Sequence, residues 1–300
     1  MVASNFALQA RPIKVLIAGG SYAGLGTALN LLDLCSGRFP RFEYNVEGEP
    51  DPRKIGVEIT IVDERDGYYH LISSPLVLAS SDFAKKAWRR FDEIPALKNI
   101  KTIQGSVQRI ESKLQKATII EANSKLPTEV PYDFFVGASG LRRAWPVVPQ
   151  SLTKADYIGE TLSHIKSVEA AANGVVVVGG GAVGIEMAAE IKLVMPTQRV
   201  TLIHSRENLL SSEPLPNDFK ERSRLALEET GVELILGERV LETLNLTNED
   251  GSQYSELILS SGAHITCGCV IHAMSKSVPS TAYMPQASLD DQQYVQVTPS

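Results

Sequence analysis

The sequence predicts an α/β protein with two Rossmann-like dinucleotide-binding domains, the second inserted in the first. Two glycine-rich turns support this prediction, Gly19-Gly20-Ser21-Tyr22-Ala23-Gly24 and Gly179-Gly180-Gly181-Ala182-Val183-Gly184. Each turn follows a short apolar run and opens a stretch with helical apolar spacing. This strand–turn–helix layout cradles a pyrophosphate at the helix N-terminus. One such turn holds one dinucleotide, so two turns predict hydride transfer between two nucleotides.

Apolar patterning predicts the elements of the first half in order. Short apolar runs beside glycine turns indicate buried parallel strands, apolar residues every three or four positions indicate a helix, and alternation indicates antiparallel strands. The insertion Ser36–Lys54 carries several prolines and is expected on the surface. The expected elements are a strand at 13–18, a helix at 22–34, a strand at 57–62 that ends at Asp63, an antiparallel pair at 100–107 and 117–121, and a buried strand at 134–138.

The second half repeats this order after Pro146 and Pro149, which mark the crossover between the domains. Cys267 and Cys269 are expected on one face of a strand as small buried residues. The expected elements are a helix at 152–172, a strand at 175–178, a helix at 182–194, a strand at 200–204, a helix at 218–230 that stops at Gly231, a strand at 232–236 and short strands within 256–271.

The first turn is interpreted as the site of an unphosphorylated nucleotide such as FAD. Gly19 permits the tight bend and Gly24 permits close packing of helix on strand. Ser21 replaces the middle glycine but is small enough to leave the backbone near a pyrophosphate. The carboxylate of Asp63 would accept hydrogen bonds from the ribose hydroxyls, although the insertion separates it from the glycines more widely than in the simple motif. The structural alternative is a glycine-rich helix start without a ligand.

The second turn carries all three glycines of the motif, Gly179, Gly181 and Gly184. The end of its second strand differs, because His204 stands where the acid would be and Arg206 follows. Loss of the carboxylate removes repulsion against a 2′-phosphate, and an arginine can bind that phosphate bidentately. We therefore expect NADPH to be tolerated or preferred over NADH. The alternative for Arg206 is a solvated surface arginine.

Composition excludes several other functions. The 300 residues are 43% hydrophobic with a net charge of −6, which is typical of a globular protein of about two domains and gives no support for nucleic-acid binding. No secretory leader, lipidation motif or run long enough to span a bilayer is recognised. Neither the three cysteines nor the five histidines show redox-motif or metal-ligand spacing, so no metal is expected.

The second unit resembles the apoptosis-inducing-factor-like (AMID-like) flavoproteins. The resemblance lies in residues 179–192, in Val200-Thr201-Leu202-Ile203-His204-Ser205, and in the short segments Phe83–Lys86 and Ala138-Ser139-Gly140. That branch contains the ferroptosis suppressor protein and is akin to type II NADH dehydrogenases. It implies a pyridine nucleotide-disulfide oxidoreductase-like fold with an FAD-binding domain at 1–145, an NAD(P)-binding domain at 146–270, and a return to the FAD domain at 271–300.

The resemblance also implies roles for individual residues. Lys86 is a speculative catalytic candidate near the flavin, with a surface lysine as the alternative reading. Glu186 would lie near the nicotinamide, or would simply favour the helix dipole. The segment Leu71–Pro75 would lie beside the isoalloxazine. The implied cofactor-binding residues are Gly19, Gly20, Ser21, Gly24, Asp63, Pro75, Val107, Ala138, Gly140, Gly179, Gly181, Gly184, Glu186, His204 and Arg206.

Two departures from the family pattern leave two functions open. Ser275 and Lys276 occupy a region where the family has glycine before proline, and the chain ends at Ser300, soon after a strand expected at 294–297 and before the family's Gly-Asp segment and C-terminal domain. One reading is an FAD-dependent NAD(P)H oxidoreductase that passes electrons to a quinone-like or other small-molecule acceptor. The other is a C-terminally shortened, non-redox dinucleotide-fold protein with a binding or accessory biosynthetic role. An incomplete gene model would also explain the short end.

The expected location is cytoplasmic. Because the family reaches quinones at membranes, peripheral contact with an intracellular membrane is left open, although the chain shows no basic amphipathic helix. The sequence indicates no particular oligomeric state.

Overall fold

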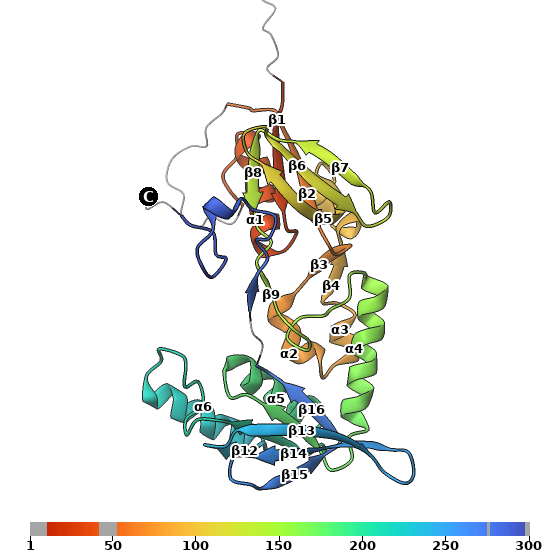
Figure 1. Cartoon of the computed structure of the whole chain (residues 1–300), viewed down its shortest axis with the longest axis vertical. Helices are drawn as coiled ribbons and strands as arrows, with labels where there is room; N and C mark the ends of the chain where they lie inside the picture. Colours follow the sequence, from red (N-terminus) through yellow and green to blue (C-terminus); the bar gives the residue numbers. More distant parts are fainter. Residues whose placement is uncertain (1–10, 42–52, 275–276, 298–300) are drawn as a thin grey trace, which may run out of the picture. The chain divides into compact units, whose positions relative to one another are not determined.

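The computed structural model describes residues 11–41, 53–274 and 277–297. The chain forms two compact units (Figure 1). The first comprises Met1–Tyr68, Arg89–Arg142 and Val278–Ser300, and the second comprises Tyr69–Trp88 and Arg143–Ser277. The sequence-predicted ranges 1–145, 146–270 and 271–300 differ from this division mainly in the stretch 69–88, which belongs to the second unit.

A six-stranded sheet with strand order β7-β6-β5-β2-β1-β8 forms the centre of the first unit. Strand β1 pairs in parallel with β2 and with β8, and β2 pairs in parallel with the start of β5. The rest of β5 continues as an antiparallel meander through β6 and β7. The strands and helix are β1 Ile13–Ala18, α1 Tyr22–Cys35, β2 Val57–Asp63, β5 Lys101–Glu111, β6 Lys116–Glu121, β7 Pro127–Pro131 and β8 Phe134–Gly137.

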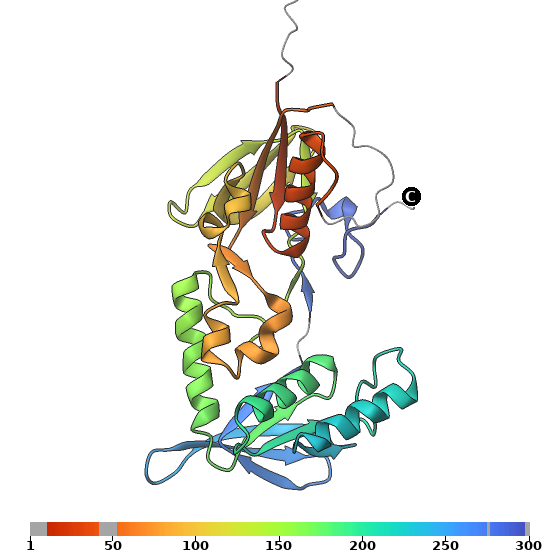
Figure 2. The same ribbon diagram turned by 180° about the vertical axis from the view of Figure 1, so that it is seen from behind.

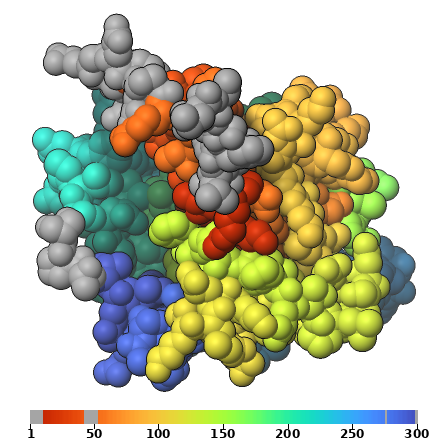
Figure 3. Space-filling view, turned by 90° about the horizontal axis from the view of Figure 1, so that it is seen from above, coloured from red at the N-terminus to blue at the C-terminus, as the bar shows by residue number. Residues whose placement is uncertain are grey.

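Alternate side chains of β1 belong to two different cores. Val15 and Ile17 pack with Ala28 of α1, whereas Leu16 and Ala18 pack on the opposite side with residues of the meander. Figure 2 shows α1 lying across one face of the sheet, and in Figure 3 the strands β6 and β7 (yellow to yellow-green) form part of the outer surface. The first unit is therefore layered as helix, parallel strands and antiparallel meander, which explains the short, continuously apolar run of β1.

The second unit has the same layers. Its four-stranded parallel sheet has strand order β12-β11-β10-β16, and a separate antiparallel sheet has order β13-β14-β15. The elements are α4 Lys154–Glu169, β10 Val175–Val178, α5 Ala182–Val194, β11 Val200–His204, α6 Asn217–Glu229, β12 Glu233–Leu236, β13 Val240–Thr247, β14 Gln253–Leu259, β15 His264–Cys267 and β16 Cys269–His272.

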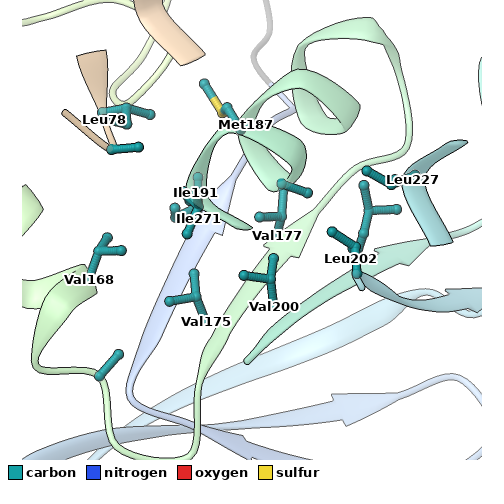
Figure 4. Close-up of a cluster of buried hydrophobic side chains, with 14 of the residues drawn as sticks. Leu78, Val168, Val175, Val177, Met187, Ile191, Val200, Leu202, Leu227 and Ile271 are labelled. Carbon is teal, nitrogen blue, oxygen red and sulfur yellow. The ribbon is translucent and has the colours of Figure 1, made fainter. Parts of the chain in front are cut away.

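The four valines of β10 alternate between two cores. Val175 and Val177 face the helices and pack with Met187 and Ile191 of α5, as Figure 4 shows. Val176 and Val178 face the other way and pack with Leu257 and other residues of the antiparallel sheet. All four side chains are buried, which is why this strand reads as an unbroken apolar run rather than an alternating one.

Segment 69–88 packs on α4 and α5 of the second unit. Leu78 and Ala79 join the core of α5, while Trp88 stacks on Tyr157 of α4 with ring centroids 5.0 Å apart. The Tyr157 hydroxyl donates to the carbonyl of Ala84 at 2.9 Å. This segment contains α2 Ser74–Val77 and α3 Ser81–Ala84.

Short strand pairs stand where the chain passes between the two units. Strands β3 and β4 form one pair, and β9 and β17 form another, antiparallel one. The bounds are β3 Gly67–Tyr69, β4 Trp88–Arg90, β9 Leu141–Arg142 and β17 Val278–Pro279. Short 3-10 turns occur at Leu71–Ser73, Phe91–Glu93, Pro95–Leu97 and Gln286–Ser288.

Three expectations about strands are wrong. Strand β8 is not buried, because it is the edge of its sheet and the Phe134 side chain is 60% exposed. Cys267 and Cys269 do not share a strand face, because the chain turns at Gly268 and places them in β15 and β16. At 294–297 there is no strand; Val295 makes only an isolated bridge with Leu289.

The other elements are confirmed within a few residues, and the antiparallel pair of the first half gains a third strand, β7. The departure at Ser275 and Lys276 and the middle of the insertion, residues 42–52, lie outside the described residues.

Candidate functional site

The first glycine turn, Gly19–Gly24, leaves no room for side chains at its ends. Gly19 has φ of +108°, a conformation that favours glycine, and its N–H donates to the carbonyl of Val62 at 2.8 Å. A Cβ built on Gly24 would lie 1.8 Å from the Gly19 carbonyl oxygen. Gly20 is also constrained, because a Cβ there would lie 2.4 Å from the ring of Phe91. The glycines therefore let β1 pass directly into α1.

Asp63 fixes the first turn from the end of β2. Its Oδ2 accepts the N–H of Gly20 at 2.6 Å and its Oδ1 accepts the N–H of Arg65 at 2.8 Å. Burial raises the pKa of this carboxyl, while the two backbone N–H donors and the Arg65 charge oppose the rise. The residue as a whole is half-buried.

Residues after β8 close the other side of the first turn. A Cβ on Gly19 would lie 2.3 Å from the carbonyl oxygen of Ala138. Gly140 has φ of +65° and is exposed. Between them, Ser139 bonds through its hydroxyl to the Ser280 carbonyl at 2.8 Å and to the Tyr283 hydroxyl at 2.9 Å. The structure thus brings Ala138 to the glycines and adds Tyr283, for which the sequence holds no motif.

Val107 belongs to the first unit, and Pro75 and Lys86 belong to the second. Val107 lies in β5, half-buried, beside a register shift opposite β6. Pro75 is buried in α2, next to Ser74, whose hydroxyl bonds to the carbonyls of Leu71 and Val147 at 2.7 and 3.0 Å. Lys86 is exposed just after α3, and its backbone N–H donates to the Phe83 carbonyl at 2.9 Å.

The second glycine turn, Gly179–Gly184, repeats the main backbone hydrogen bonds of the first. Gly179 has φ of +121° and donates its N–H to the Ile203 carbonyl at 2.8 Å. A Cβ on Gly184 would lie 1.8 Å from the Gly179 carbonyl oxygen. Ala273, after β16, takes the place of Ala138 and donates its N–H to Val178 at 2.9 Å. The repeat seen in the sequence is therefore also a repeat of hydrogen bonds.

The middle positions of the two turns differ from the ends. Gly181 has φ of −81°, and a Cβ built there would meet no protein atom within 4 Å. Ser21 is the matching residue of the first turn and has φ of −102°. Neither backbone conformation requires glycine, so the protein itself accommodates the serine that departs from the motif.

His204 occupies in the second turn the place of Asp63 in the first. Its Nδ1 accepts the N–H of Gly180 at 3.1 Å, and its Nε2 lies 3.0 Å from the hydroxyl oxygen of Ser211. Burial lowers the pKa of the imidazole, the charge of Arg206 lowers it further, and the Asn208 backbone opposes these effects. The sequence pattern missed Ser211, which lies in an irregular loop where no periodicity marks it.

Arg206 and Glu186 are both exposed. Arg206 follows β11, and its backbone carbonyl accepts the N–H of Gly237 at 3.0 Å. Glu186 lies in the second turn of α5, the helix that starts at the second glycine turn.

No cluster of three potential metal ligands occurs within 11–41, 53–274 and 277–297. The three cysteines are free thiols. Cys267 is buried, as expected for a small core residue, and burial raises the pKa of Cys267 and Cys269 to about 11. Among the helices of these ranges, none combines the length and the hydropathy that crossing a bilayer requires.

Comparison with known proteins supports the interpretation of the two turns. Residues 13–297 match the family described as pyridine nucleotide-disulphide oxidoreductase. Oxidoreductase OXR1 of Ajellomyces capsulatus is 51% identical over 295 residues, which cover 96% of this chain and 64% of that protein. Ferroptosis suppressor protein 1 of Xenopus tropicalis is 25% identical over 272 residues, covering 90% of this chain and 65% of that protein.

Among solved structures, an NAD-dependent persulfide reductase from A. fulgidus has a TM-score of 0.65 at 19% identity, covering 93% of this chain and 48% of that one. This likeness confirms the fold class. The chain spans a little under two thirds of the length of the first two relatives. The match over 13–297 and the 51% identity confirm the resemblance predicted from the motifs and agree with FAD and NAD(P)H as cofactors. The chain belongs to the pyridine nucleotide-disulphide oxidoreductase family.

Proposed function

We propose that this chain is an FAD-dependent NAD(P)H oxidoreductase with a quinone-like small molecule as acceptor. The observation that carries the proposal is the pair of glycine turns, each opening a helix of 13 or 14 residues and each supported by the same backbone hydrogen bonds. Two such turns in one chain provide two nucleotide sites, one per unit. When bound, FAD would take a hydride from NAD(P)H and pass the electrons on.

The residues at the first turn fit FAD. Asp63 uses one hydrogen bond on each carboxylate oxygen, and an ionised carboxylate has about four lone-pair sites, so sites remain for ribose hydroxyls. The backbone at Gly19–Ser21 stands at the N-terminus of α1, where the free N–H groups and the helix dipole favour a pyrophosphate. Ala138 packs against Gly19, and Ser139, which follows it, is held by hydrogen bonds to Ser280 and Tyr283.

The residues at the second turn fit NAD(P)H. A Cβ built on Gly181 would meet no protein atom within 4 Å, so the N-terminus of α5 beside it is open to a phosphate. Arg206 offers a guanidinium for a 2′-phosphate, and Glu186 is exposed on the helix that follows the turn. We propose these residues, with Gly179 and Gly184, as the NAD(P)H-binding set.

The acceptor and the location are proposed from the family resemblance that the motifs carry. The ferroptosis suppressor proteins and the fungal oxidoreductase are among the curated proteins that the chain matches over most of its length. Electron transfer in such a site depends on positioning and stacking more than on a side-chain acid or base. Accordingly no nucleophile is assigned, Lys86 stays a speculative catalytic candidate near the flavin, and a cytoplasmic location, with peripheral membrane contact left open, stays part of the proposal.

Reconstitution tests this function. The full chain is incubated with FAD, desalted, and mixed with NADPH or NADH under argon and then with a panel of quinones. We expect a retained flavin band that bleaches with the nicotinamide and returns with a quinone. Gly24→Ala is expected to abolish flavin retention, whereas Gly26→Ala, on the same helix with no atom within 4 Å of a built Cβ, retains it.

A colourless protein that takes up no FAD would contradict the proposal. It would favour instead a dinucleotide-fold protein with a binding or accessory biosynthetic role.

A further inference from the structure

We propose that His204 is a positioning residue for the second glycine turn, not a ligand of the ribose, and that it makes this turn selective for a 2′-phosphorylated nucleotide. The inference rests on the proposed function, because it concerns the nucleotide that the second turn binds. Three observations carry it: the equivalence of His204 with Asp63, the hydrogen bonds of its ring, and the charges around it.

The two glycine turns give His204 and Asp63 the same structural task. Each residue ends the second strand of its unit, and each accepts the N–H of the second glycine, at 2.6 Å for Gly20 to Asp63 and 3.1 Å for Gly180 to His204. In both turns this contact satisfies a backbone donor beside the site. An acceptor is therefore needed at this position for the shape of the turn, whatever ligand it binds.

Asp63 and His204 differ in the hydrogen-bond acceptor sites that remain for a ligand. A neutral imidazole has one acceptor nitrogen and one N–H donor, compared with about four lone-pair sites on a carboxylate. Since Nδ1 of His204 accepts from Gly180, the ring proton is on Nε2 and donates to the Ser211 oxygen at 3.0 Å. His204 thus has no acceptor left for a ribose hydroxyl, and the Gly180 N–H holds the tautomer that makes this so.

The charges at and near His204 also favour a 2′-phosphorylated nucleotide. Doubly protonated His204 would turn an N–H toward the Gly180 N–H, so the hydrogen bonds favour the neutral ring. The turn then lacks the negative charge that Asp63 brings to the first. Arg206 lies two residues after His204 and is exposed. The carboxylate of Glu207 lies near Gly237, because a Cβ built on Gly237 would be 2.6 Å from its Oε1. Arginine binds phosphate bidentately, so a 2′-phosphate gains a partner and meets no carboxylate at position 204.

Calorimetric titration of the full chain with ADP-ribose and with 2′-phospho-ADP-ribose tests the inference without catalysis. We expect the wild type to bind the phosphorylated ligand more tightly. His204→Asp should shift the ratio of dissociation constants toward ADP-ribose by about tenfold to a hundredfold, because it restores spare acceptors and a charge. His204→Asn, whose amide oxygen accepts from Gly180 without a charge and keeps one lone pair, should shift the ratio less than His204→Asp does.

Two further variants separate the roles of the neighbours. Arg206→Ala should weaken only the phosphorylated ligand, by about tenfold or more. ¹⁵N NMR of the imidazole reports the tautomer: the wild type should show the Nε2–H form, and Ser211→Ala should keep it, because the Gly180 N–H still requires an acceptor at Nδ1. Gly184→Ala, which puts a methyl group against the Gly179 carbonyl, is the control: any binding that remains in this variant takes place elsewhere in the chain.

The outcomes that overturn the inference are distinct. A wild type that prefers ADP-ribose, an unchanged ratio in His204→Asp, or an Nδ1–H tautomer each overturns it while leaving the proposed function intact. If neither ligand binds the wild type at all, the proposed function fails together with the inference.

Discussion

At the scale of single residues, the glycines of the two turns fall into two kinds. Gly24 and Gly184 are required by the protein itself, because a Cβ on either would lie 1.8 Å from a carbonyl oxygen. Gly181 is not, because its φ is ordinary and its surroundings hold no protein atom within 4 Å of a built Cβ. A glycine that the fold does not need is most simply explained by a ligand that approaches the backbone closely.

This difference gives a prediction for paired variants. Gly181→Ala should leave the unfolding temperature nearly unchanged and weaken NADPH binding, because the methyl group enters the space of the phosphates. Gly184→Ala should lower stability by roughly 2 kcal/mol or more through strain against the Gly179 carbonyl. Thermal unfolding and NADPH titration measure the two effects. Equal losses of stability in both variants would contradict the argument.

Residue patterns predicted much of both turns. Gly19, Gly24, Gly179 and Gly184 follow from spacing alone, because only glycine suits a tight bend against a strand. The partners of His204 could not be predicted in this way. Ser211 lies in a loop that carries no periodic signal, and only the folded structure brings its hydroxyl to within 3.0 Å of the imidazole.

At the scale of elements, α1 is tied to the start of the insertion by a buried carboxylate. Asp33, with a side chain 6% exposed, accepts from Arg41 at 2.6 Å and from Arg38 at 2.7 Å. An acid near a helix C-terminus is unfavourable for the helix dipole, and the two arginines compensate for it. Hydrogen bonds from Arg41 and then Arg38 lower the pKa of Asp33 to about 2, despite burial.

The lowered pKa fixes the sign of a pH effect. The stabilisation by Asp33 is complete above its ordinary pKa of 3.8 and is lost as the pH falls through about 2. Asp33→Asn should therefore cost about 2 kcal/mol in urea unfolding at neutral pH, and the difference from the wild type should shrink as the pH falls below about 4. Asp92→Asn, which breaks the exposed pair with Arg90, is the control and should cost under about 0.5 kcal/mol.

Element prediction succeeded where burial is continuous and failed where it is partial. Strands β1, β10 and β11 are buried along almost their whole length, so their sequences are plainly apolar. Strand β7, Pro127–Pro131, is mostly exposed and bounded by prolines, and β13 has no fully buried residue. The turn at Gly268 was not predicted because the contact that requires glycine there comes from a distant part of the sequence. A Cβ on Gly268 would lie 2.5 Å from the carbonyl of Ala172.

At the scale of the whole molecule, each unit has its own cores around its own parallel sheet. Ile17 of β1 is fully buried in the first unit, and Ile191 of α5 is fully buried in the second. Separate cores make unfolding in more than one step the expected behaviour of such a chain.

Calorimetry of core variants tests this expectation. Ile17→Ala and Ile191→Ala should each cost about 2–5 kcal/mol, and each should lower the transition of its own unit. FAD should raise the transition affected by Ile17→Ala, and NADPH the one affected by Ile191→Ala, because a ligand stabilises the unit that binds it. A single transition lowered equally by both variants would show that the units unfold together.

The membership of segment 69–88 has a practical consequence for dissecting the protein. The chain enters the second unit, leaves it and enters it again, so any uninterrupted stretch that contains all of that unit also contains residues 89–142 of the first. A fragment running only from 143 to 277 would lack Leu78 and Ala79, leaving bare the flank of α5 that they cover, and would deprive Tyr157 of its partner Trp88. A soluble nucleotide-binding half would have to be made by fusing 69–88 through a short linker to 143–277, so that the linker replaces residues 89–142 and the order of the chain is kept.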